Sequence, residues 1–241
     1  MSSDPRLIVA LDLPTVDEAR AVTERLGDAV SFYKVGLQLL ATNGMTLARD
    51  LKAGGKQVFL DWKLHDIGAT VEKAAAALAG AGGDFLTVHG EPQVMRAAVR
   101  GRGSAELKIL AVTVLTSLSD HDLADIGYVD TAADLVARRV RQAIACGCDG
   151  VISSPNEASR ARSIARAEGR EDFLVVTPGI RPAGAALDDQ ARAATPGSAL
   201  QAGATHLVVG RPITGASDPR AAALEIVREM GEASAPVTAG V

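Results

Sequence analysis

Short apolar runs alternate with longer stretches of helical periodicity from one end of the chain to the other. Apolar runs of this length, bounded by polar or glycine-containing turns, are typical of strands buried on both faces of a parallel sheet. The pattern predicts strands at residues 7–11, 32–35, 58–61, 85–88, 109–114, 150–152, 173–177 and 206–209.

The segments between these runs place apolar residues three and four positions apart, as one buried face of a helix requires. Local signals mark several helix ends: Thr15 with Glu18 forms a capping-box pattern, and Gly54 closes a helix. The pattern predicts helices at residues 16–26, 37–53, 70–81, 92–100, 131–145, 156–168, 196–202 and 219–230.

Eight strand–helix units in about 230 residues match the count and length of an α/β fold of the (β/α)₈ TIM-barrel type. We therefore predict a single barrel domain over residues 1–241, with 231–241 as a loose tail; a doubly wound sheet is the alternative. The eighteen residues 178–195 after the seventh strand are longer than a usual βα loop and predict a lid or binding loop. The loop 115–130 is also long enough to contain a helical turn.

The net charge and the distribution of apolar residues argue against nucleic acid and membranes as binding partners. A net charge of -4 gives no overall attraction for nucleic acid or an anionic membrane. No apolar stretch approaches the roughly 20 residues of a membrane span, and the first residues lack the pattern of a signal peptide. We expect a cytoplasmic protein in which Cys146 and Cys148 are reduced thiols.

Polar side chains gather at the predicted carboxyl ends of the strands, which is where barrel enzymes place their active sites. No comparable set stands at the opposite ends. In chain order the residues are Asp12, Lys34, Asp61, Lys63, His89, Thr116, Arg181 and Arg211.

The segment after the third strand is the most informative. Side chains alternate along a strand, so Asp61 and Lys63 should point the same way, with Asp66 just beyond. Charges grouped at a buried strand end are costly to desolvate unless they pair or have a function. The structural alternative is a salt-bridged strand end that caps the next helix.

The order of the charges indicates a proton donor, and the last two loops indicate a phosphate ligand. In the order Lys34, Asp61, Lys63, Asp66 each charge has an opposite neighbour, which would keep all four ionised in a dry cavity. A lysine held as an ammonium is a proton donor and not a Schiff-base nucleophile. A glycine is paired with an arginine after strand seven, in Gly179-Ile-Arg181, and after strand eight, in Gly210-Arg211, where barrels often bind phosphate.

These motifs resemble the orotidine 5′-monophosphate decarboxylase family over essentially the whole chain. The shared features include Asp61-x-Lys63-x-x-Asp66-Ile, Tyr-Lys34-Val-Gly, Gly-Ile-Arg181 and Val-Gly210-Arg211-Pro. The resemblance implies a homodimeric barrel that converts orotidine 5′-monophosphate to uridine 5′-monophosphate and CO₂ in de novo pyrimidine biosynthesis, with no metal and no cofactor.

The resemblance also implies residue roles. Lys63 is the expected proton donor, in a network with Lys34, Asp61 and Asp66, where Asp66 and Thr70 reach in from the partner subunit. The expected substrate ligands are Asp12 and Lys34 for the ribose, Thr116 for the pyrimidine, and Gln190, Arg181, Gly210 and Arg211 for the phosphate side. The chain departs from the family at Gly68-Ala69, where Pro-Asn is common, which loosens the turn after Asp66.

Two alternatives remain open from the residues. A metal-dependent sugar-phosphate decarboxylase or epimerase of the same barrel class could use Asp61, His65, Asp66 and His89 as ligands, although Lys63 would compete with the cation. A non-catalytic nucleotide-binding barrel would not need the buried row of lysines and carboxylates.

Overall fold

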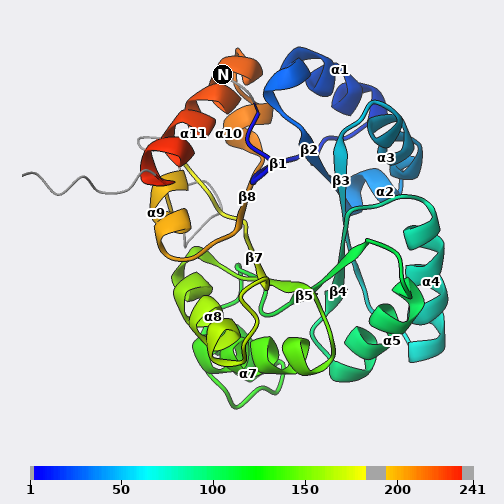
Figure 1. Ribbon diagram of the computed structural model, residues 1–241, viewed down its shortest axis with the longest axis vertical. Coiled ribbons are helices and arrows are strands. Elements are labelled where there is room, and N and C mark those ends of the chain that lie inside the picture. Colours follow the sequence, from blue (N-terminus) through cyan, green and yellow to red (C-terminus); the bar gives the residue numbers. More distant parts are fainter. Residues whose placement is uncertain (1–2, 183–193, 235–241) are drawn as a thin grey trace, which may run out of the picture.

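Eight parallel strands pair in chain order and close into a barrel in the computed structural model, which describes residues 3–182 and 194–234 (Figure 1). Closure confirms the (β/α)₈ prediction and excludes the doubly wound alternative. The strands are β1 Leu7–Ala10, β2 Phe32–Gly36, β3 Gln57–Leu64, β4 Phe85–His89, β5 Lys108–Val112, β6 Gly150–Ile152, β7 Leu174–Thr177 and β8 His206–Val209.

Strand residues are buried on both faces, which explains their nearly continuous apolar sequence. One cluster, which includes Phe32, Phe59 and Phe85, fills the inside of the barrel. A larger cluster lies between the outer faces of the strands and the helices, and Trp62 belongs to it. The apolar interior therefore forms a low-dielectric floor beneath whatever lies at the carboxyl ends of the strands.

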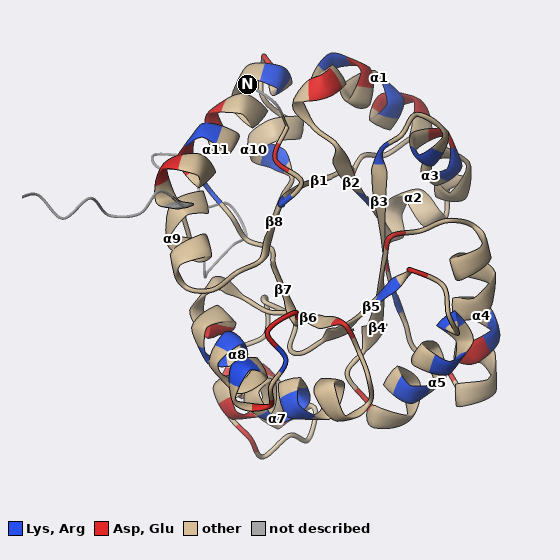
Figure 2. Ribbon diagram, viewed as in Figure 1, with Lys and Arg blue, Asp and Glu red and all other residues tan. Residues whose placement is uncertain are grey.

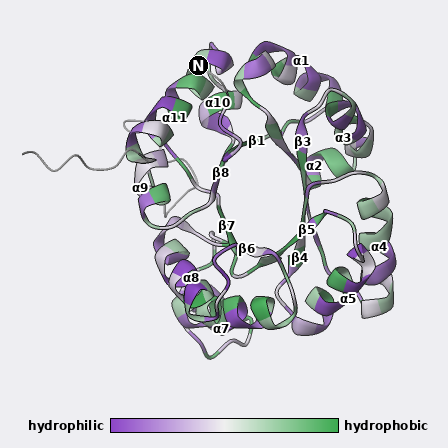
Figure 3. Cartoon of the chain, viewed as in Figure 1, coloured by the Kyte–Doolittle hydropathy of each residue, from purple (hydrophilic) through white to green (hydrophobic). Residues whose placement is uncertain are grey.

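The helices surround the barrel with charged residues of both signs (Figure 2) and with apolar residues in between (Figure 3). Thr15 caps the first helix by accepting a hydrogen bond from the backbone N–H of Glu18 at 3.2 Å. The helices are α1 Val16–Leu26, α2 Leu37–Leu40, α3 Gly44–Ala53, α4 Gly68–Gly80, α5 Pro92–Arg102, α6 Asp120–Asp125, α7 Ala132–Ala145, α8 Pro155–Ala167, α9 Pro196–Gln201, α10 Arg211–Thr214 and α11 Pro219–Ser234, with a 3₁₀ turn at Gly27–Ala29.

The continuous helix predicted over residues 37–53 is wrong. The chain breaks between α2 and α3, where Asn43 adopts a left-handed conformation with φ of 70°. Asn is one of the few residues that enter this region readily, and an Asn-Gly pair is a common turn signal. Because of the break, α2 is a separate turn at the end of β2.

Of two further predictions, the structure confirms one and contradicts part of the other. The loop over 115–130 does contain a helix, α6, which starts at a capping box between Ser119 and Asp122. The tail expected at 231–241 is wrong in its first part because α11 continues to Ser234; residues 235–241 lie outside the described ranges. Among the described residues, no helix is long and apolar enough to cross a membrane.

Candidate active site

A pocket of about 540 Å³ opens at the carboxyl ends of the strands. This volume falls within the usual range for small-molecule sites. Eight of the residues singled out from the sequence line it, and they are Asp12, Lys34, Asp61, Lys63, Thr116, Arg181, Gly210 and Arg211.

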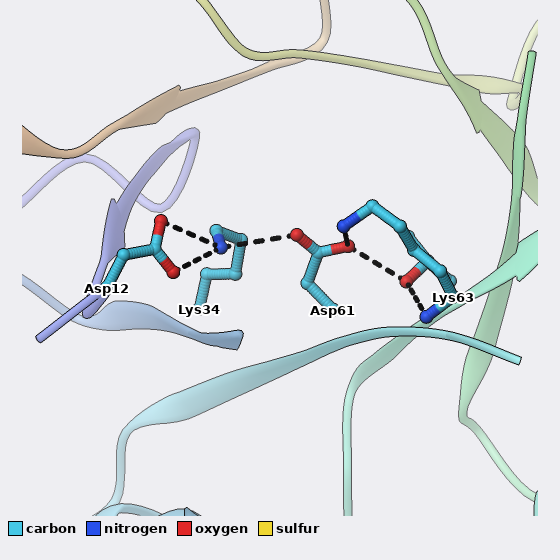
Figure 4. Close-up of polar contacts among 5 residues, drawn as sticks. Asp12, Lys34, Asp61 and Lys63 are labelled. Atoms are coloured by element: carbon cyan, nitrogen blue, oxygen red, sulfur yellow. Dashed lines mark hydrogen bonds and ion pairs between the residues drawn. The ribbon is translucent and has the colours of Figure 1, made fainter. Parts of the chain in front are cut away.

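Four charged side chains form a continuous row along one wall of the pocket (Figure 4). The Lys34 ammonium lies 2.9 Å from Asp12 Oδ1 and 3.2 Å from Asp61 Oδ2. On the other side of Asp61, Oδ1 lies 2.9 Å from the Lys63 ammonium. Within one chain the order is therefore minus, plus, minus, plus, and it begins at Asp12 instead of ending at Asp66.

The register of the strands produces this row. Lys34 pairs with Ala10 of β1 and Phe59 of β3, whereas Asp61 pairs with Gly36, two residues further along β2. The backbone of Lys34 thus lies two residues closer to the floor of the barrel than that of Asp61. Its side chain extends toward the pocket, between the carboxylates of Asp12 and Asp61. Gly36 leaves the necessary space, because a Cβ there would overlap Asp12 Oδ1 and lie only 3.0 Å from the Lys34 ammonium.

Burial and mutual charge act against each other in this row. Burial alone would lower the pKa of Lys34, but the carboxylates of Asp61 and Asp12 outweigh it and raise that pKa. Burial alone would raise the pKa of Asp61, but Lys34 and Lys63 outweigh it and lower that pKa. Both groups are therefore ionised at neutral pH, although Lys34 is only 7% exposed.

The strand that carries Asp61 and Lys63 is irregular, and it extends beyond the predicted end at residue 61. Leu60 pairs with Leu86 and Leu64 pairs with Val88, so four steps along β3 match two along β4. Lys63 lies in this bulge with a left-handed φ of 47°, which non-glycine residues seldom adopt. Asp61 and Lys63 do meet, as alternation predicted, but through a bulge that re-aims the side chains.

Two arginines stand across the pocket from Lys63. In a closed barrel of eight strands, β7 and β8 lie on the side of the ring away from β3 (Figure 1). Arg181 follows β7 and is 7% exposed, and Arg211 begins α10 directly after β8. Gly179 has φ of 78°, a left-handed turn that favours glycine and brings the chain back toward the pocket.

The base of the long loop after β7 is fixed. Ile180 and Ala194 form a parallel bridge, and the backbone N–H of Arg181 donates to the Ala194 carbonyl at 2.9 Å. Gln190 lies outside the described residues. The arginine at the base of this loop is thus held in place by backbone contacts.

The charge of the pocket differs in sign from that of the whole protein. Its described lining has four cations, Lys34, Lys63, Arg181 and Arg211, against the two carboxylates Asp12 and Asp61. The excess of two positive charges suits a ligand that carries phosphate, while the protein overall has a net charge of -4.

Asp66 and Thr70 do not join this pocket within one chain. Both are exposed, at the turn into α4 and in its first turn. Asp66 Oδ1 accepts a hydrogen bond from the backbone N–H of Ile67 at 2.6 Å, and Ile67 is 72% exposed. Among the residues that the structure describes, no ion pair joins Asp66 to Lys63.

The histidines considered as metal ligands pack on each other. The rings of His65 and His89 stack with centroids 4.6 Å apart, outside the set that lines the pocket. Burial, followed by the nearby His65, lowers the pKa of His89. Within residues 3–182 and 194–234, no group of three or more His, Cys, Asp or Glu side chains is placed to hold a metal ion.

The sequence did not indicate several residues of the site. Leu37 and Gln38 line the pocket from α2, and Thr214 lines it from α10; both helices are single turns without a periodic signal. Thr87 of β4 is fully buried and contacts both Asp61 and Lys63. Its sequence context is that of an ordinary strand threonine, so only the register could have revealed it.

Comparison with known proteins gives a consistent result. The sequence model of the "Orotidine 5'-phosphate decarboxylase / HUMPS family" matches residues 5–226. A protein of Caulobacter vibrioides named orotidine 5'-phosphate decarboxylase is 70% identical over 230 residues, covering 95% of this chain and 99% of the relative. A relative of the same name from Rhodopseudomonas palustris is 55% identical over 229 residues, covering 95% and 96% of the two chains.

A solved structure shows the same architecture. The crystal structure of orotidine 5'-phosphate decarboxylase from Lactobacillus acidophilus superposes with a TM-score of 0.81 at 39% identity. The match covers 94% of this chain and 99% of that one.

Proposed function

The chain belongs to the orotidine 5′-phosphate decarboxylase / HUMPS family of enzymes, as its motifs suggested, and we propose that it converts orotidine 5′-monophosphate to uridine 5′-monophosphate and CO₂. The observation that carries the proposal is the pairing, in one pocket, of the Asp12–Lys34–Asp61–Lys63 row with two arginines on the opposite side. The family implies a role in pyrimidine biosynthesis, and we place the enzyme in the cytoplasm.

The order of strands around the barrel suggests how the substrate lies. Going round the ring from β8 through β1 and β2 to β3, the pocket presents Arg211, Asp12, Lys34 and then Lys63. We propose that the phosphate binds at Arg211, Gly210 and Arg181, with Gln190 from the long loop. The ribose then contacts Asp12 and Lys34, and the pyrimidine reaches Lys63, with Thr116 as a further contact.

At that position Lys63 can supply the proton that the reaction needs. When the bond between the pyrimidine ring and its carboxylate breaks, CO₂ leaves and the electron pair stays on the ring carbon. The ammonium of Lys63 stabilises the developing carbanion and then transfers a proton to it; water later reprotonates the amine. Asp61 Oδ1 lies 2.9 Å from this ammonium and holds it in position. No step in this scheme requires a metal or an organic cofactor.

Asp61 would also lie near the substrate carboxylate. Two like charges in a pocket with an apolar floor would disfavour the bound substrate relative to a transition state that is losing its charge. In this proposal the stabilisation of the carbanion by the Lys63 cation lowers the barrier more than this ground-state repulsion does.

We further propose a homodimer with shared active sites. Asp66 and Thr70 are exposed beside Ile67, an apolar side chain that is itself 72% exposed. An exposed apolar residue flanked by polar residues to which the family resemblance assigns a role in the partner's site fits a surface that a second subunit covers. Asp66 of each subunit would then extend the row of charges in the partner's pocket.

The rival function is that of a metal-dependent sugar-phosphate decarboxylase or epimerase of the same barrel class. The relatives at 70% and 55% identity are both named orotidine 5'-phosphate decarboxylase, which favours the nucleotide over a sugar phosphate. A metal site at Asp61 is disfavoured because both carboxylate oxygens already contact lysine ammonium groups.

The direct test uses the purified protein after exhaustive treatment with EDTA. We expect orotidine 5′-monophosphate to lose its ultraviolet absorbance and release one CO₂ per uridine 5′-monophosphate formed. A 3-keto-gulonate phosphate should not react. Loss of activity with EDTA that Mg²⁺ restores, or turnover of the sugar phosphate alone, would support the metal-dependent rival. Nucleotide binding without turnover would support the non-catalytic barrel.

A further inference from the structure

At the bulge in β3, a single residue of β4 lies opposite a three-residue segment of β3. Leu60 and Leu64 of β3 pair with Leu86 and Val88 of β4, so Asp61, Trp62 and Lys63 stand opposite Thr87 alone. A bulge interrupts the regular ladder of backbone hydrogen bonds. Some other group must therefore satisfy the polar backbone atoms of this segment.

The hydroxyl group of Thr87 takes over that task. The backbone N–H of Lys63 donates to Thr87 Oγ1 at 3.0 Å, and Thr87 Oγ1 donates to Asp61 Oδ1 at 2.9 Å. The direction of both bonds is fixed, because an amide can only donate and an ionised carboxylate can only accept. Asp61 Oδ1 thus receives the Thr87 hydroxyl and the Lys63 ammonium together.

The segment held in this way is the one whose geometry the chemistry needs. Lys63 has φ of 47°, in the left-handed region that a side chain with a Cβ disfavours. Such conformations persist when surrounding contacts hold them in place, and they cluster at functional sites. Thr87 contacts the backbone of this strained residue and also the carboxylate that binds its ammonium.

We propose that Thr87 is a positioning residue for the decarboxylation: its hydroxyl locks the left-handed backbone of Lys63 and the rotamer of Asp61, and so fixes the Lys63 ammonium. The inference rests on the proposed function of Lys63. Thr87 is completely buried and is not among the residues that line the pocket. It acts through its neighbours, so its loss should reduce the rate of the chemical step and leave substrate binding nearly unchanged.

The test compares Thr87→Val, which keeps the shape but lacks the hydroxyl, with Thr87→Ser, which keeps the hydroxyl. Thr177→Val is the matched control, since Thr177 is equally buried at the end of β7 and, within the described part of the chain, its hydroxyl has no hydrogen-bond partner. Steady-state kinetics with orotidine 5′-monophosphate and thermal unfolding are measured for each.

For Thr87→Val we expect kcat to fall on the order of 100-fold, as small misplacements of a catalytic group do, with KM nearly unchanged. Thr87→Ser should regain most of the activity, and Thr177→Val should match the wild type. If Thr87→Val does not fold, Thr87→Ala is compared with Thr87→Ser in the same way.

Three results would overturn the inference. They are a wild-type kcat in Thr87→Val, an equal loss in Thr87→Ser, or an equal loss in Thr177→Val. Wild-type protein and Lys63→Ala are assayed beside these variants. If the wild type is active, Lys63→Ala is inactive and Thr87→Val is fully active, only the role of Thr87 fails. If the wild type does not turn over the nucleotide, or Lys63→Ala does, the proposed function fails and the role of Thr87 with it.

Discussion

The ammonium of Lys34 lies 3.2 Å from the carboxylate of Asp61, and both side chains are largely enclosed above the apolar floor of the barrel. A buried ion pair is weak evidence for stability, because desolvation of both charges offsets much of their attraction. Its removal from one side only is different, since it leaves the other charge with too few partners. Replacing one member of the pair should therefore change the free energy of unfolding, and its effect on activity can be measured separately.

Lys34→Met should lower the free energy of unfolding by about 3–5 kcal/mol, because Asp61 keeps only Lys63 as a cationic partner. The double variant Lys34→Met/Asp61→Leu should regain much of that stability by removing the stranded carboxylate. Neither variant should turn over the nucleotide. Urea unfolding at neutral pH measures the stabilities, and strictly additive losses in the double variant would contradict the coupling.

The sequence predicted the barrel well because each strand is a short apolar run between turn residues, and this pattern is a strong signal for a buried parallel strand. It predicted most of the pocket for a related reason, since the carboxyl ends of parallel strands must meet at one end of a barrel. Residues such as Asp12, Lys34 and Arg211 were found from that rule alone, and the structure brings them to one pocket.

The failures have physical causes. Asn43, which precedes α3, interrupts the predicted helix through a left-handed conformation that the apolar periodicity of the flanking segments hid. The extension of β3 to Leu64 depends on a bulge, and bulges arise from the pairing of two strands and leave little trace in either one. Thr87 matters because of that register, so its role could not be inferred from its own neighbours in the sequence.

His206 makes a prediction about acid stability. Its ring lies against Phe32 and Phe85 inside the barrel, and burial lowers its pKa to about 4. The nearby charges of Asp4 and Arg6 act in opposite directions on it. The unfolded chain binds this proton below about pH 6.5, whereas the folded protein does not until about pH 4. The free energy of unfolding should thus fall by up to about 3 kcal/mol as the pH drops through that window.

His206→Phe should abolish this part of the pH dependence while keeping an aromatic ring in the barrel. His121→Gln is the control, since the side chain of His121 is 83% exposed. Urea unfolding at about pH 7 and about pH 4.5 provides the comparison. The same slope with pH in His206→Phe as in the wild type would show that other groups cause it.

Arg211 should act through the phosphate of the substrate. Binding energy from a remote group can hold the reactive complex, so Arg211→Ala should reduce kcat/KM far more for orotidine 5′-monophosphate than for orotidine, which has no phosphate. The ratio of the two efficiencies, measured for wild type and variant, isolates this effect. Equal losses on both substrates would place Arg211 in another role.

The shared site makes a prediction about mixed dimers. Lys63→Ala and Asp66→Ala should each be nearly inactive as homodimers. In a mixed dimer one pocket combines both changes, while the other has an intact Lys63 and an intact Asp66. Random reassortment makes about half of the dimers mixed, so roughly a quarter of the wild-type activity should return.

The subunits are exchanged by mild denaturation and refolding, with wild-type protein carried through the same steps. Reassortment is verified with a size tag on one variant. If tagged and untagged subunits demonstrably exchange and no activity returns, Asp66 serves the pocket of its own chain.

The role of Lys63 is the central claim, and the turnover number of Lys63→Ala tests it most directly. The side chain of Lys63 is 27% exposed and Asp61 keeps Lys34 as a partner, so the variant should fold, which its thermal unfolding verifies. Loss of both the cation and the proton source should raise the barrier by upward of ~5 kcal/mol, so that turnover of orotidine 5′-monophosphate falls by several orders of magnitude. A folded Lys63→Ala that keeps about a tenth of the wild-type turnover, a barrier change of only about 1.4 kcal/mol, would contradict the account.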